Sequence, residues 1–172
     1  SGASAGTSSG SIELSTLDAA VSGVSGSITL ATGDSADSTA GAITLSVGNS
    51  DITASDLNLL AGDSTTSSGG SIYLHSGAGS ATSSGIVTIK SANAGASGTS
   101  GAVSVLSGKA TFGVSGSLEV QSGDSLEGDT GSISLSTGDA TSGTAGSISM
   151  AVGDSDTATG GALTLTSGTS SS

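Results

Sequence analysis

Carboxylate side chains recur at one position of this chain, directly after a glycine. The position holds Asp34, Asp63, Asp124, Asp139 and Asp154. A hard cation such as Ca²⁺ takes several oxygen ligands, carboxylates among them, so a fold that aligned these residues could bind calcium. The alternative is that each Asp only serves a turn, by accepting hydrogen bonds from nearby backbone N–H groups. The nonapeptide G-G-x-G-x-D-x-U-x of calcium-binding β-helices is absent.

Hydroxyl side chains are the second candidate, because they alternate with aliphatic residues. The alternating position holds Thr29, Thr44, Thr88, Thr164, Ser104, Ser134 and Ser149. A flat array of such hydroxyls resembles the threonine ladders of ice-binding proteins. The same position also holds Glu13, Asn58, Tyr73 and Glu119, which would interrupt a flat array. Exposed strand residues and acceptors of O-linked sugars are the alternatives.

Catalytic chemistry finds little support in the sequence. His75 is the single histidine, and Tyr73 and Lys90 are expected on the same outer face. No nucleophile, base and orienting group recur together, and no phosphate-binding loop or metal-ligand triad is present. We therefore predict no catalytic residue, no cofactor-binding residue and no enzyme activity, and interpret these three side chains as an exposed patch.

The element that must position these side chains is a short repeat. Its centre is an aliphatic pair with one residue between the two members. The pairs are Ile12/Leu14, Ile28/Leu30, Ile43/Leu45, Leu57/Leu59, Ile72/Leu74, Val87/Ile89, Val103/Val105, Leu118/Val120, Ile133/Leu135, Ile148/Met150 and Leu163/Leu165. Successive pairs begin 14 to 16 residues apart, so the repeat has about fifteen residues.

Alternation with a period of two predicts a half-buried strand in each repeat. The 30 glycines and the missing 3.6-residue period exclude helices. Glycines after the strands, such as Gly33, Gly48 and Gly138, are expected to supply the turns. One strand cannot bury its pair alone, so we expect the repeats to stack into a parallel sheet. The predicted fold is all-β: a parallel β-solenoid of about eleven coils with a thin aliphatic core.

The fifteen-residue repeats are themselves arranged in a longer repeat. Ile28 matches Ile133 and Ile43 matches Ile148, each 105 residues apart, and Val47 matches Val152. Residues 28–132 are thus a block of seven repeats that begins again at residue 133. We expect residues 1–172 to form a single array and to be a piece of a longer one.

The charge and composition of the chain exclude several classes of binding partner. The net charge is −12, with Lys90 and Lys109 as the only lysine or arginine residues. Phosphate binding needs clustered cations, so nucleic acid and anionic membrane surfaces are excluded as partners. No apolar run of 18 residues occurs, which excludes insertion into a membrane. No cysteine is present to form disulfides or thiolate metal sites.

The strings GSISLSTGDATSGTAGSISM and GGSIYLHSGAGSATSSGIVTIKSANAGASGTSGAVSV are examples of a repeat style that runs through nearly the whole chain. They resemble the long Ser/Gly/Thr-rich β-solenoid repeat proteins of microalgal cell surfaces, such as those of diatoms. They are also similar to runs in large viral and bacterial surface fibres. The resemblance implies a wall, adhesive or fibre role, and no catalytic residue can be carried over from it.

The sequence therefore predicts a structural repeat protein, a rod or filament segment located outside the cell or on a cell or particle surface. We expect self-association end to end through open sheet edges. The alternative is a binding module that faces ice or surface polysaccharide, or a calcium-dependent adhesin with Asp34, Asp63, Asp124, Asp139 and Asp154 as ligands.

Overall fold

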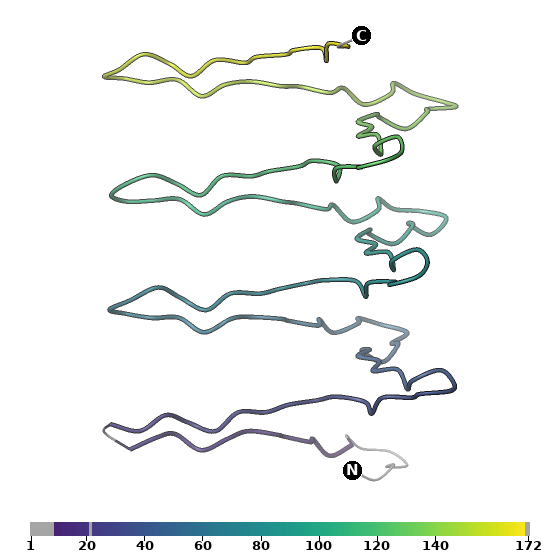
Figure 1. The fold of residues 1–172 in the computed structure, drawn as a ribbon, viewed down its shortest axis with the longest axis vertical. Helices are drawn as coiled ribbons and strands as arrows, with labels where there is room; N and C mark the ends of the chain where they lie inside the picture. Colours follow the sequence, from purple (N-terminus) through teal and green to yellow (C-terminus); the bar gives the residue numbers. More distant parts are fainter. Residues whose placement is uncertain (1–8, 21, 171–172) are drawn as a thin grey trace. The chain divides into compact units, whose positions relative to one another are not determined.

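The computed structural model describes residues 9–20 and 22–170. None of these residues lies in a helix or a strand. The backbone instead runs in extended segments separated by short bends, which Figure 1 draws as a smooth ribbon that doubles back on itself. The predicted parallel β-solenoid is therefore wrong: the described residues contain no sheet and hence no stacked coils.

The chain divides into two units, Ser1–Val87 and Thr88–Ser172, which we call the first and second halves. The boundary falls inside one aliphatic pair, Val87/Ile89. Each half is built from the same kind of extended segment and bend.

The fifteen-residue repeat is visible in the spacing of the bends. They lie at 36–38, 51–52, 65–67, 80–82, 96–98, 111–113, 126–128, 141–143 and 156–158. Each bend begins eight or nine residues after the first member of the preceding aliphatic pair. One repeat therefore consists of one extended segment, which carries the pair, and one bend.

The bends other than the one at 51–52, where Ser55 replaces the glycine, are flanked by a close approach between the segments on either side, which we call the neck. The first neck residue lies two positions after an aliphatic pair, and the second is a glycine two positions before the next pair. A Cβ atom on Gly161 would lie 2.9 Å from Cγ1 of Val152, and one on Gly70 would lie 3.3 Å from Cβ of Ala61. Two backbone hydrogen bonds of 2.9 Å also close necks, from Gly70 N to Gly62 O and from Gly85 N to Gly77 O.

A side chain in place of glycine would be crowded at the tightest necks and not at the positions where turns were expected. A Cβ on Gly33, Gly48 or Gly138 would meet nothing within 4 Å, and none of the three has a left-handed backbone. The left-handed glycines are Gly98 and Gly143, with Gly113 between them in sequence. Each of these three is the last residue of a bend.

The predicted thin aliphatic core is also wrong, because none of the described residues is buried. Two aliphatic side chains in fifteen residues leave little surface to exclude from water, while ordering the backbone opposes folding at every residue. The sheet was expected to supply the remaining stabilisation. The described backbone makes only three hydrogen bonds to itself, two of them at necks.

Candidate functional site

The most regular polar arrangement in the structure is a serine-capped bend. The Ser64 hydroxyl accepts a hydrogen bond from Ser67 N at 2.9 Å, and the Ser125 hydroxyl accepts one from Gly128 N at 3.0 Å. The Ser155 hydroxyl accepts one from Ala158 N at 3.1 Å. In the fourth case the Ser50 hydroxyl lies 3.2 Å from both Ile52 N and Thr53 N. Such serine turns satisfy backbone donors locally.

Three of the five predicted calcium ligands lie beside these caps. Asp63, Asp124 and Asp154 directly precede the capping serines Ser64, Ser125 and Ser155. At these three bends the hydrogen-bond acceptor is a serine hydroxyl, so the turn-serving role expected of aspartate is taken there by the next residue. The five predicted ligands are all exposed.

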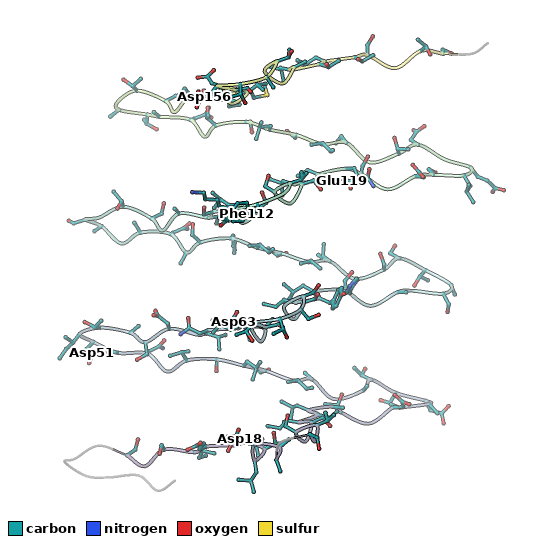
Figure 2. All side chains as sticks on the ribbon, turned by 90° about the vertical axis from the view of Figure 1, so that its left-hand side faces the viewer. Asp18, Asp51, Asp63, Phe112, Glu119 and Asp156 are labelled. Atoms are coloured by element: carbon teal, nitrogen blue, oxygen red, sulfur yellow. The ribbon has the colours of Figure 1, made fainter. Side chains whose placement is uncertain are left out.

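The predicted ligands are divided between the two halves. Asp34 and Asp63 belong to the first half, whereas Asp124, Asp139 and Asp154 belong to the second. Residues 9–20 and 22–170 contain no group of three or more acidic, histidine or cysteine side chains that could hold a metal ion. Figure 2 labels one of the predicted ligands, Asp63, in the first half. Alignment into a ladder needed the stacked sheet, and calcium binding by these residues stays a prediction.

The hydroxyl candidates divide into two groups. Threonines between the members of aliphatic pairs, such as Thr29 and Thr44, are exposed, and no sheet aligns them among the described residues. Two threonines at necks use their hydroxyls within the chain. Thr16 Oγ1 donates to Gly26 O and Thr32 Oγ1 donates to Gly41 O, both at 3.1 Å.

The patch around His75 contains one definite contact. The Tyr73 and His75 rings stack with their centroids 6.2 Å apart and an angle of 27° between their planes. Both rings are exposed, and the described residues enclose no pocket. A stacked pair on an open surface can contact a planar or apolar group.

Sequence reasoning identified the neck glycines only as turn residues. The signal for their second role was present, because Gly26, Gly41, Gly70, Gly146 and Gly161 all stand two residues before an aliphatic pair. What the sequence did not reveal is the residue opposite each of them. That residue is Val152 in one neck and the smaller Thr32, Ala61 or Thr137 in others.

The described residues include no helix that is long and apolar enough to cross a membrane. Comparisons with protein-family models, curated proteins and solved structures find no match to this chain.

Proposed function

We propose that this chain is a structural repeat protein that builds filaments outside the cell or on a cell or particle surface. It works through its surface and carries out no reaction. One fifteen-residue repeat supplies nearly all of its residues, and the repeated feature is a bend with an aliphatic segment. A catalytic or transport protein needs a distinct site, whereas a building block needs the same surface many times.

The observation that carries the proposal is the amount of exposed surface. The accessible surface is 16919 Å², and the chain has a mass of 15.6 kDa. A compact folded protein of that mass exposes roughly 7,000 Å². The excess is several times the roughly 1,600 Å² that a standard protein–protein interface buries. A chain with this much uncovered surface gains stability by covering it against other molecules.

The net charge of the chain makes self-association depend on ionic strength. A net charge of −12 keeps separate copies apart at low ionic strength and keeps the free chain in solution. Salt screens that repulsion but leaves the apolar attraction in place. The same charge disfavours nucleic acid and anionic lipid as partners.

Electron microscopy tests the proposal directly. The purified chain, residues 1–172, is concentrated in moderate salt and examined by negative stain, with sedimentation velocity on the same samples. We expect filaments of uniform width in equilibrium with single chains. A chain that remains monomeric at every concentration and ionic strength would contradict the proposal. Surface labelling of intact cells with an antibody to the chain tests its location.

A further inference from the structure

We propose that the aliphatic pairs form the surface at which a second copy of this chain docks, and that other exposed apolar side chains do not. The inference rests on the proposed function and names the contact that the filament uses. It begins with an unequal exposure among the apolar residues. Ile43, the first member of a pair, is 48% exposed, while Ile52, nine residues later in a bend, is 94% exposed.

The same contrast occurs in the second half. Leu135, the second member of a pair, is 69% exposed, and Leu126, nine residues earlier in a bend, is 100% exposed. From Ile28 to the end of the chain, the first member of every pair is less exposed than the second. In each of these pairs the first member is therefore the more covered and the second the more free.

Two repeats extend this surface by one residue. Val47 and Val152 follow the pairs Ile43/Leu45 and Ile148/Met150, and they are the least exposed of the large apolar side chains, at 40% and 44%. Both stand at the neck position, where other repeats carry threonine, serine or alanine. These two repeats, 105 residues apart, present three aliphatic side chains in alternation and are the strongest docking positions.

A second copy is the occupant that matches this surface. A partner without the fifteen-residue period could cover one or two pairs, whereas a second copy meets every pair in the overlap. Its extended segments also offer unpaired backbone N–H and C=O groups at the same intervals, which favours strand-like pairing between chains. The uncovered surface exceeds what a stable contact between two copies requires.

The distribution of charge permits that contact. The segments SITLA at Ser27, AITLSV at Ala42 and SISMAV at Ser147 contain no charged residue. Most acidic residues stand at or near the bends, as Asp51 and Asp156 do, although Glu13 and Glu119 stand inside aliphatic pairs. These three uncharged segments can therefore meet the same segments of a second copy without bringing carboxylates into the interface.

The chain supplies a control of identical composition. One double variant carries Ile43→Ser and Leu135→Ser, and the other carries Ile52→Ser and Leu126→Ser. Both lose one isoleucine and one leucine and gain two serines, so they share mass, charge and mean hydropathy. The concentration above which assembly begins is measured for both by light scattering and sedimentation velocity.

We expect the Ile43/Leu135 variant to raise that concentration by about tenfold or more, and the Ile52/Leu126 variant to leave it within about twofold. If the two variants raise the assembly concentration equally, or if the bend variant raises it more, the aliphatic pairs are not the docking surface. Filament formation by the unaltered chain would still support the proposed function. No assembly of the unaltered chain would overturn the proposed function as well.

Two further measurements distinguish docking between copies from a change within one chain. The hydrodynamic radius of each variant below its assembly concentration should equal that of the unaltered chain, which shows that the monomer is unchanged. Sheet signal in circular dichroism should rise with protein concentration. A sheet signal independent of concentration would mean that repeats of one chain cover each other, and it would overturn the inference.

Discussion

Val152 and Gly161 stand so close across a bend that no side chain fits between them. A Cβ atom at residue 161 would lie 2.9 Å from Cγ1 of Val152, a distance that real Cβ contacts essentially never show. Valine has little freedom to move that methyl group, because branching at Cβ restricts its rotamers. The pair is the tightest neck in the described chain.

The first prediction follows from this neck. We expect Gly161→Ala to open the bend at 156–158 and to speed hydrogen exchange at the capped amide of Ala158 by about fivefold or more. Gly160→Ala is the control, since a Cβ on Gly160 would meet nothing within 4 Å. Adding Val152→Ala to Gly161→Ala should restore slow exchange. Equal exchange in the two glycine variants would show that the contact does not hold the bend.

The second prediction concerns the serine caps. Ser64→Ala removes the acceptor of the Ser67 amide, so we expect that amide to exchange faster by about fivefold. Ser68→Ala changes a serine just past the same bend, and its hydroxyl is not the cap. NMR of amide exchange distinguishes the two variants. If Ser68→Ala has as large an effect, the hydroxyl of Ser64 does not stabilise the bend.

The third prediction uses the net charge of −12. Raising ionic strength from about 0.01 M to about 1 M shortens the Debye length from about 30 Å to about 3 Å. Repulsion between copies then weakens, and the concentration needed for assembly should fall. Light scattering across a salt series measures it. Assembly that weakens as salt rises would mean that ion pairs, and not apolar contacts, join the copies.

The fourth prediction concerns the stacked rings. The Tyr73 ring should shift the resonances of the His75 ring protons, and Tyr73→Leu should remove that shift. Phe112→Leu, which removes the single phenylalanine of this chain, should leave the His75 resonances in place. Unchanged His75 resonances in Tyr73→Leu would contradict the stack.

The fifth prediction tests the calcium ligands proposed from the sequence. If Asp34, Asp63, Asp124, Asp139 and Asp154 bind Ca²⁺, calorimetry should show saturable binding at roughly 10⁻³ M or below. Replacing all five with Asn should abolish it, and Mg²⁺ should not compete well. Binding that never saturates, or that survives the replacement, would mean that the five aspartates attract cations only non-specifically and do not form a calcium site. Thermal hysteresis during freezing is the matching test of the ice-binding alternative.

Local features of this chain could be predicted from the sequence, and non-local ones could not. Ile43 and Leu45, which alternate with Thr44, are less exposed than Ile52 in the neighbouring bend, although neither is buried. Alternation indicates which side of a segment prefers contact, but it does not supply the partner. The predicted sheet needed each segment to pair with one about fifteen residues away, and the described residues make no such pairing.

The predicted calcium site depends on the same non-local pairing, and it stays a prediction. The position of Asp63 after a glycine was evident, and a turn nearby was expected. The acceptor is the hydroxyl of Ser64 instead, one residue further along, which reaches the amide of Ser67 three residues ahead. Proximity between Asp63 and Asp34, in contrast, depended entirely on the stacking of repeats.

The neck has a consequence for how the chain is made. Its two sides lie only nine or ten residues apart in sequence, as in Val152 with Gly161 or Thr16 with Gly26. Loops of that length close within roughly 10–100 ns, far faster than a ribosome adds the next residue. Each bend can therefore complete itself during synthesis without waiting for distant residues. Gain or loss of a whole repeat then alters the length of the product and leaves every remaining bend intact.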